Sequence, residues 1–275
     1  MDTAAAPPNT NESLVRTQDP DRYLLSMFYG PEVRAHLWSL YAFNHEIAKT
    51  REVVTDTNIG LIRLQWWRDA LAEFYEKNEV KKHDVMTGLA AAIWRYNLPR
   101  DTFDHLIYAR EFDLEDRQPG SLEGLCNYVD YTHTPLLRMA VIIAGEDPDD
   151  PALQPVAMAY SLAGLIRAVP YHMGQGRCFL PEDLMRRAGI NFGTLQIGQS
   201  KDALIPVITA VREKAEDLLR QAGQSEQGRL VRLHRVMTAQ YLNKIKRLHD
   251  DCYDVRLSVP PALRTIGLWR AAQKA

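Results

Sequence analysis

The sequence predicts an all-α fold, a bundle of helices in a single domain. Alternation of apolar and polar residues, which is typical of half-buried strands, is almost absent from the 275 residues. Apolar residues instead recur with the helical period along most of the chain. Prolines and acidic residues also stand where helices would begin, as at Pro31 and Glu32. We therefore expect packed helices with room for a ligand cavity between them.

Prolines and N-cap residues delimit the predicted helices. The first begins at Pro31 and carries apolar residues as far as Ile47. The other expected helices are 59 to 77, 85 to 96 after Asp84, 102 to 117 after Asp101, Ser121 to Ala144 with a kink at Pro135, 151 to 169 after Asp150, a short helix after Pro181, 201 to 222, 227 to 251, and a last one after Pro261. No linker rich in Gly, Ser or Pro separates two halves, so one domain over residues 20 to 275 is predicted.

Residues 1 to 19 are predicted to be a disordered tail. They contain neither the basic start nor the apolar core of a secretory signal, and their single Arg argues against a transit peptide. No apolar run elsewhere approaches the roughly 20 residues that a membrane-spanning helix needs. The expected protein is therefore soluble, or at most peripheral to a membrane.

Charge and cysteine content narrow the class of protein. With 33 basic and 35 acidic residues the net charge is -2, so no global field would recruit nucleic acid. Cys126, Cys178 and Cys252 are far apart and odd in number, which argues against a disulfide framework and against a thiolate zinc site. We expect a reducing cytoplasm, with the periphery of the inner membrane as the other possible location.

Several segments, in order, resemble the squalene/phytoene synthase family, whose members condense prenyl diphosphates head to head. The matching segments are P-E-V-R at 31 to 34, L-Y-A-F at 40 to 43, D-L at 113 and 114, L-C-N-Y-V-D-Y-T at 125 to 132, G-R-C-F-L-P at 176 to 181 and Y-D-V-R-L-S at 253 to 258. The resemblance implies an isoprenoid-synthase-type bundle with a central cavity. It also implies two D-x-x-x-D motifs that hold Mg²⁺, because each spacing puts two carboxylates on one side of a helix.

The four acidic positions of those motifs are mostly replaced here. In register with L-Y-A-F the first pair falls on Ala48 and Glu52, and in register with G-R-C-F-L-P the second falls on Ala168 and His172. One carboxylate remains where the family has four, and lost charge stabilisation commonly costs several kcal/mol, about 1.4 kcal/mol for each tenfold in rate. We therefore predict no catalytic residue, and Mg²⁺ as a cofactor only if the chain is an active transferase. Glu46 is out of register.

Other residues are candidates for a ligand site. Glu52 and His172 suit a transition metal better than Mg²⁺; the alternative is a polar pair left from the ancestral site. Tyr128 matches the family's Tyr of cation chemistry, but T-H-T at 132 to 134 replaces small apolar residues, so a buried structural Tyr is the alternative. Arginines recognise phosphate without a metal, or else pair with acids on helix surfaces. The predicted ligand-binding residues are Tyr41, Asn44, Arg51, Arg167, Tyr171 and Arg177.

Two apolar segments are candidate contact surfaces. Trp66 and Trp67 are consecutive, so they must point to different sides of a helix, and one of them is expected in the core. The other either packs in the core as well or lies beside Arg63 and Arg68 at a partner surface. The terminal segment is basic and amphipathic, which predicts docking on the bundle or on a membrane surface. Its relevant residues are Leu263, Arg264, Ile266, Leu268, Trp269, Arg270 and Lys274.

A narrower resemblance is to a divergent branch of the family that includes a mitochondrial complex I assembly factor. It is carried by A-F-N-H-E-I-A at 42 to 48, G-L-I-R-L-Q-W-W at 60 to 67 and L-I-R-A-V-P-Y-H at 165 to 172. The branch also departs from both acidic motifs. The resemblance implies a bacterial, catalytically degenerate, chaperone-like assembly factor whose partners are respiratory complex I subunits or assembly intermediates. The alternatives are an active prenyl transferase, and a non-catalytic protein that binds an isoprenoid or lipid in the cavity.

Overall fold

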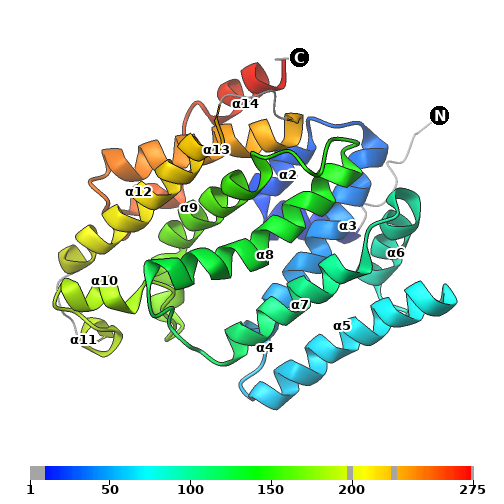
Figure 1. Ribbon diagram of the computed structural model, residues 1–275, viewed down its shortest axis with the longest axis horizontal. Helices are drawn as coiled ribbons and strands as arrows, with labels where there is room; N and C mark the ends of the chain where they lie inside the picture. Colours follow the sequence, from blue (N-terminus) through cyan, green and yellow to red (C-terminus); the bar gives the residue numbers. More distant parts are fainter. Residues whose placement is uncertain (1–9, 197–200, 224–227, 274–275) are drawn as a thin grey trace, which may run out of the picture. The chain divides into compact units, whose positions relative to one another are not determined.

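The computed structural model describes residues 10–196, 201–223 and 228–273, and every regular element within these ranges is a helix (Figure 1). The all-α prediction is confirmed. The α-helices are α1 Thr10–Gln18, α2 Pro20–Ser26, α3 Pro31–Ala48, α4 Thr50–Val53, α5 Thr57–Lys77, α6 Asp84–Tyr96, α7 Arg100–Leu114, α8 Leu122–Ile143, α9 Leu153–Gly174, α10 Glu182–Arg187, α11 Phe192–Gln196, α12 Ile205–Gln221, α13 Arg229–Arg247 and α14 Arg264–Ala272. Two short 3₁₀ helices are η1 Lys201–Leu204 and η2 Val255–Ser258.

The chain divides into two compact units. The first comprises Met1–Glu115 and Met139–Glu146, and the second comprises Asp116–Arg138 and Asp147–Ala275. The second boundary falls inside the continuous helix α8, so no linker composition marks it. One domain over residues 20 to 275 stays a prediction. The central cavity that the resemblance implied stays a prediction.

Residues 10 to 18 are helical, so the prediction of a disordered tail over residues 1 to 19 is wrong for this part. Val15 is buried, and the Asn11 side-chain amide donates a hydrogen bond to Ser39 Oγ at 3.2 Å. A Cβ at Gly88 would collide with both polar groups, so the glycine permits the close approach. A helix with so few apolar residues carries no stripe that the sequence could show. Residues 1 to 9 lie outside the described residues.

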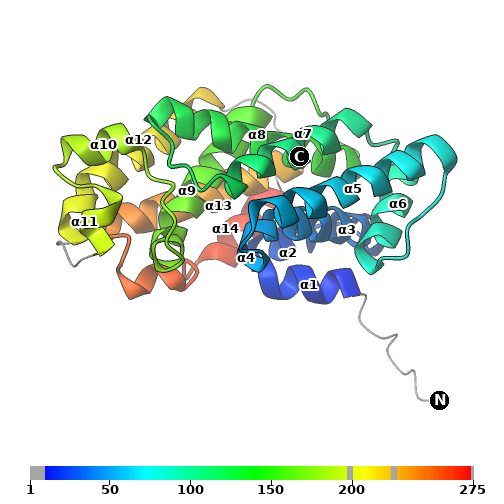
Figure 2. The same ribbon diagram turned by 90° about the horizontal axis from the view of Figure 1, so that it is seen from below.

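The first unit is built on α3, which contacts α1 and α6, while α5 lies alongside α7 (Figure 2). Phe43 from α3 packs edge to face on Trp67 of α5 and on Phe103 of α7, with ring centroids 5.3 and 5.4 Å apart. Such aromatic pairs contribute beyond the area that they bury. They fix α3, and with it the segment that leads to Ala48 and Glu52.

The second unit is built on α9, which contacts α12 and α13. Its buried residues occur on every side of the helix, as expected of a central helix; they are Leu153, Val156, Ala157, Ala159, Ser161, Leu162, Ala163, Ile166 and Val169. The helix also continues through Pro170 to Gly174, whereas the sequence predicted an end at residue 169. Burial of each aliphatic side chain stabilises by about 1.5–3 kcal/mol, which together outweighs the roughly 3 kcal/mol that an interior proline costs.

Two helices end earlier than predicted. α7 was expected to reach residue 117 and α13 to reach residue 251. Asp116 follows α7 with a φ of 51°, and His249 and Asp250 follow α13 with φ of 57° and 59°. These left-handed conformations stop a helix, and Asp, Asn and His adopt them more readily than most residues.

None of the described helices combines the length and the apolar character that crossing a membrane requires.

A buried ion pair links α12 to the end of α13. The Arg212 guanidinium is almost fully buried and donates two hydrogen bonds to Asp250, at 2.7 and 3.1 Å. Thr209 Oγ1 donates a third to the same carboxylate at 2.6 Å. These bonds hold the left-handed turn at Asp250 against α12.

We predict that Asp250→Asn lowers the free energy of unfolding by about 1.5 to 3 kcal/mol, because the buried Arg212 loses one charged partner and keeps Glu216, whose carboxylate lies 2.9 Å away. Asn tolerates the left-handed conformation, so backbone strain does not contribute. The matched control is Asp149→Asn, which removes an exposed ion pair with Arg138 and should cost less than about 1 kcal/mol. Urea denaturation measures both, and equal losses would contradict the assignment.

Candidate functional site

The two positions of the first motif lie at a break between helices. Ala48 is the last residue of α3, Lys49 forms a turn, and Glu52 is exposed on the short helix α4. The resemblance implied one continuous helix, and the structure has two. Arg51 Nη1 donates to the carbonyl oxygen of Val54 at 2.9 Å, beyond the end of α4. With alanine at one position, the motif presents a single carboxylate.

Glu46, which is out of register with the family's first acidic motif, forms ion pairs with two basic residues. Its buried carboxylate accepts from Lys49 Nζ at 2.5 Å and from Arg63 Nη2, on α5, at 2.8 Å. This pairing ties the end of α3 to α5. Burial and, secondly, the positive charge of Lys49 lower the pKa of the neighbouring His45.

Two of the predicted ligand-binding residues are buried in the first unit. Tyr41 Oη has no hydrogen-bond partner among the described residues, and burial raises the pKa of this phenol well above its usual range. Asn44 Oδ1 accepts from Arg110 Nη2 at 3.4 Å, and Arg110 pairs with Asp113 at 3.3 Å. The sequence did not lead us to predict Arg110 as a site residue. The one signal near it was the D-L motif that begins at Asp113. Ligand binding by this cluster stays a prediction.

The two positions of the second motif do share one helix. Ala168 and His172 lie four residues apart on α9. The His172 ring is half-buried and packs 4.8 Å from the Phe179 ring, and its Nδ1 has no hydrogen-bond partner within the described ranges. Burial first, and then the positive charge of Arg177, lower the pKa of His172 to about 4. The imidazole is therefore neutral at physiological pH.

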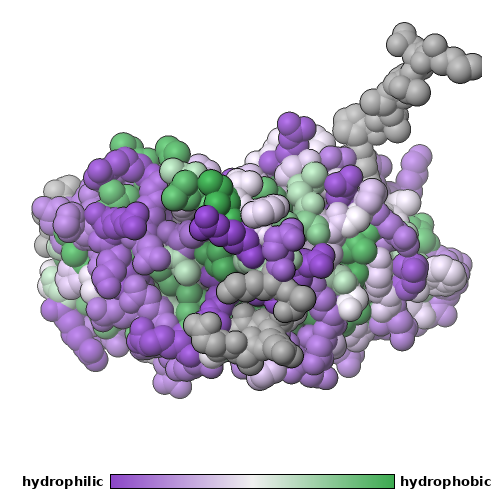
Figure 3. Space-filling model, turned by 90° about the horizontal axis from the view of Figure 1, so that it is seen from above, coloured by the Kyte–Doolittle hydropathy of each residue, from purple (hydrophilic) through white to green (hydrophobic). Residues whose placement is uncertain are grey.

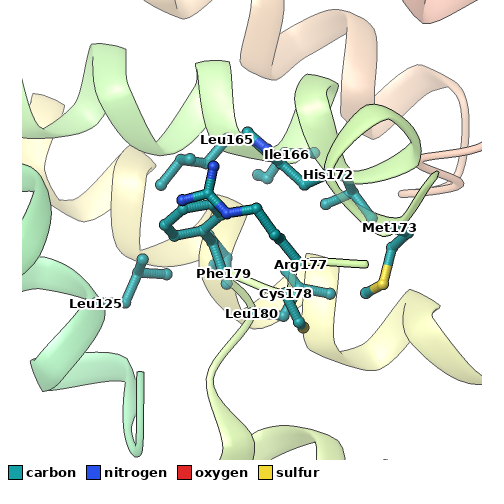
Figure 4. Close-up of a pocket in the computed structure, with 11 residues that line it drawn as sticks. Leu125, Leu165, Ile166, His172, Met173, Arg177, Cys178, Phe179 and Leu180 are labelled. Carbon is teal, nitrogen blue, oxygen red and sulfur yellow. The ribbon is translucent and has the colours of Figure 1, made fainter. Parts of the chain in front are cut away.

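The pocket beside His172 is small and mostly apolar (Figure 4). Its volume is about 10 Å³, close to the space that one water molecule needs. Aliphatic, aromatic and sulfur-containing side chains surround His172 and Arg177 in it; they are Leu125, Leu165, Ile166, Val169, Met173, Cys178, Phe179, Leu180 and Val211. A prenyl chain does not fit this space, since pockets for such ligands span several hundred Å³.

The two candidate ligand-binding arginines of the second unit, Arg167 and Arg177, lie over aromatic rings. The Arg167 guanidinium carbon lies 3.7 Å from the centroid of the Tyr241 ring, and that of Arg177 lies 5.0 Å from the centroid of Phe179 (Figure 4). Arg177 Nε also lies 3.5 Å from a carboxylate oxygen of Asp116. The structure thus shows contacts for these arginines that require no phosphate, and phosphate binding stays a prediction.

Phe179 brings the candidate residues of the second unit together. Its ring stacks on Tyr128 at 5.5 Å, in addition to its contacts with His172 and Arg177. Phe179 was quoted in G-R-C-F-L-P but was not predicted as a site residue. Tyr171, in contrast, is half exposed, and its ring lies 5.5 Å from that of His172.

The threonine hydroxyl groups of the T-H-T segment form hydrogen bonds within their own helix, α8. Thr132 Oγ1 donates to the Tyr128 carbonyl oxygen at 2.8 Å and lies 2.9 Å from His133 Nδ1. Thr134 donates to Asp130 at 2.5 Å. These hydroxyl groups therefore have partners within α8.

The residues at the motif positions do not fit a Mg²⁺ cluster. Two are alanines, and His172 is a neutral nitrogen ligand in an apolar pocket beside the cation of Arg177. Mg²⁺ prefers oxygen ligands and is repelled by a nearby positive charge. Across the described ranges, no group of three or more His, Cys, Asp or Glu residues could hold a metal ion. Glu52 belongs to the first unit and His172 to the second, so their pairing as metal ligands stays a prediction.

A second concave surface, here called the α5 groove, lies in the first unit. It is lined by Val54, Ile59, Ile62, Arg63, Trp66, Trp67 and His83, with a volume of about 380 Å³. Trp67 is buried in the core, whereas Trp66 is only partly covered, with Lys81 Nζ 5.9 Å from the centroid of its ring. The two tryptophans therefore point to different sides, as the sequence predicted.

We predict a pH dependence of stability from His172. Because its pKa of about 4 lies below the ordinary 6.5, the unfolded chain binds the proton first as the pH falls. As the pH falls from 6.5 to about 4, the contribution of His172 to the free energy of unfolding should decrease by about 2 to 3 kcal/mol. Above pH 6.5 this contribution should stay constant. His172→Gln should remove that part of the slope. Urea denaturation at neutral pH and at pH 4 compares the two proteins, and identical slopes would contradict the prediction.

The sequence model of the squalene/phytoene synthase family matches residues 15–263. Among known proteins, the chain is 28% identical over 264 residues to "NADH dehydrogenase (ubiquinone) complex I, assembly factor 6" of Bos taurus, covering 93% of this chain and 79% of that protein. It is 30% identical over 180 residues to the Homo sapiens protein of the same name, covering 65% and 54%. It is 24% identical over 209 residues to phytoene synthase of Thermus thermophilus, covering 76% and 71%.

Two solved structures share the fold. One is squalene synthase HpnC from Alicyclobacillus acidocaldarius, with a TM-score of 0.75 at 20% identity, covering 88% of this chain and 93% of that one. The other is a dehydrosqualene synthase in complex with ligand, with a TM-score of 0.76 at 18% identity, covering 95% and 93%. Since the family model spans most of the chain and the fold agrees with it, the protein belongs to the squalene/phytoene synthase family.

Proposed function

We propose that this protein is an assembly factor for respiratory complex I and does not turn over prenyl diphosphates. The observation that carries the second half of the proposal is the surroundings of His172. A neutral imidazole beside the Arg177 cation, in a pocket of about 10 Å³, stands where the family's chemistry needs a carboxylate. Support for the partner comes from relatives named as complex I assembly factor 6, which the chain matches over as much as 93% of its length.

The charge at the motif positions argues against ionisation of a diphosphate. Mg²⁺ ions bound by carboxylates would neutralise the leaving pyrophosphate in a synthase. Here Glu52 is the one carboxylate at the four positions, and the second motif offers none. Removing such charge stabilisation commonly costs a factor of about a hundred or more in rate for each group lost. The fold is retained while this part of the chemistry is absent.

The α5 groove is the surface that we assign to a partner subunit. Ile59, Ile62 and Trp66 follow at helical spacing along one face of α5, and Ile62 is 69% exposed. An amphipathic helix of a partner would place its apolar face in such a groove. Trp and Arg are the residues that most often dominate binding energy, and the groove contains both.

The cysteines support the expected bacterial cytoplasm as the compartment. Cys126, Cys178 and Cys252 are all buried and unpaired, and burial raises the pKa of each thiol. Protonated, inaccessible thiols behave as small apolar core groups. A protein whose cysteines stay as free thiols suits a reducing compartment.

We predict that cells lacking this chain contain less assembled complex I, measured on native gels and as NADH oxidation by membranes. The full chain should restore the level. Glu52→Gln should restore it equally, because the proposed role uses no carboxylate chemistry at that position. Ile62→Asp should fail to restore it, since a charge in the α5 groove disrupts an apolar contact.

The matched control for the groove variant is Tyr131→Asp, which places the same charge on an exposed residue of α8. It should behave as the wild type, and both variants should reach normal protein levels. An unchanged level of complex I after deletion would contradict the assembly role. Rescue by Ile62→Asp would leave the role standing and overturn the assignment of the groove.

A further inference from the structure

The last helix has two apolar faces, and one of them is buried. Leu268 and Ala271 of α14 are buried against α13, and Arg232 Nε donates to the Ala271 carbonyl oxygen at 2.9 Å. A Cβ at Gly267 would collide with the side-chain amide of Gln240. The glycine therefore permits the close contact between the two helices, and α14 docks on the second unit through this face.

The other apolar face of α14 is exposed. Leu263 is 68% exposed, Ile266 is 50% exposed and Trp269 is 59% exposed. Ile266 and Trp269 lie three residues apart on one side of the helix, and Leu263 is its N-cap residue, three positions before Ile266. Figure 3 views the molecule from the side on which α14 lies at the edge of Figure 1, and hydrophobic patches interrupt the hydrophilic surface there. A continuous exposed apolar strip on a soluble unit indicates a contact surface.

Basic residues flank this strip in the sequence, and acidic residues are absent from the same stretch. Residues 255 to 275 contain no Asp or Glu, and neither do residues 228 to 248, which include α13. The two stretches hold 10 of the 33 basic residues of a chain whose net charge is -2; they are Arg229, Arg232, Arg235, Lys244, Lys246, Arg247, Arg256, Arg264, Arg270 and Lys274. Positive charge is therefore concentrated in the two stretches of sequence that contain α13 and α14, which pack on each other.

Two of the nearby acids have basic partners in the same unit. Asp250 pairs with Arg212, and Asp254 pairs with Arg256, one of the ten basic residues, at 2.6 Å. Lys246, Arg247 and Arg270 are exposed at the surface. A partner at this surface would therefore meet positive charge beside an apolar strip.

We propose that the α14 strip, defined as Leu263, Ile266 and Trp269, docks the protein on the surface of an anionic lipid bilayer. Basic amphipathic helices with exposed aromatic and aliphatic residues lie at the boundary between headgroups and acyl chains. Trp is enriched at that boundary, and anionic headgroups attract nearby Lys and Arg. The α5 groove is concave, whereas the α14 strip lies on the outer side of a helix that packs on α13. Such a strip suits a flat partner such as a bilayer surface. This inference is independent of the proposed role in complex I assembly.

The test uses the full chain and sedimentation with vesicles of phosphatidylcholine alone or mixed equally with phosphatidylglycerol. The protein should sediment with the mixed vesicles and stay in solution with the neutral ones, and added salt should weaken the binding. The double variant Ile266→Ser with Trp269→Ser, and separately Arg270→Glu, should each lower the partition coefficient at least about tenfold.

Matched controls carry the same changes away from the strip. Trp94→Ser alters an exposed Trp of α6, and Arg187→Glu reverses an exposed charge of α10; both should bind mixed vesicles as the wild type does. Because Ile266 and Trp269 are exposed, their replacement should leave the helical circular dichroism unchanged. No binding to mixed vesicles, equal binding to neutral ones, or equal loss in the controls would overturn the proposal. Binding to an acidic protein without binding to vesicles would overturn it as well.

Discussion

Packing of α9 against α12 and α13 is the constraint on which the second unit depends. The helix is apolar on all sides, and its burial carries it through Pro170 to Gly174. Because the helix continues, Ala168 and His172 keep the spacing of a metal-binding motif while lying in packed surroundings. Arg167 stacks on Tyr241, and His172 packs on Phe179. The fold of the family is thus kept, and His172 and Arg167 make packing contacts at the second motif.

In the first unit, residues next to the first motif also have structural partners. Glu46 is a buried carboxylate, and it ties α3 to α5 through Arg63. Glu52, which is in register with the family's motif, is exposed on α4 after a break in the helix. The buried hydroxyl of Tyr41 has no partner among the described residues, and ligand binding by Tyr41 stays a prediction.

Much of the fold could be predicted from the sequence, because helix signals are local. Pro31 marks the first residue of α3, and the apolar period located α5, α6 and α8 to within two residues at their ends. α1 was missed because it buries little beyond Val15 and Asn11, too little for an amphipathic pattern. The end of α9 was misjudged because tertiary burial outweighed the local effect of Pro170. The boundary between the units lies inside α8, where no sequence signal marks it.

The positions of the candidate site could be predicted, and its contacts could not. Register with the family's motifs located His172 and Arg177, but the low pKa of His172 depends on burial that only the folded unit shows. The contacts of Phe179 with Tyr128 and His172 likewise depend on the folded structure, so the sequence did not predict them. Pyrophosphate release shows whether the fold persists without synthase chemistry. Purified full chain is incubated with farnesyl or geranylgeranyl diphosphate and Mg²⁺ or Mn²⁺. We expect no release above the protein-free blank, whereas release that Glu52→Gln abolishes would show that the chain is an active transferase.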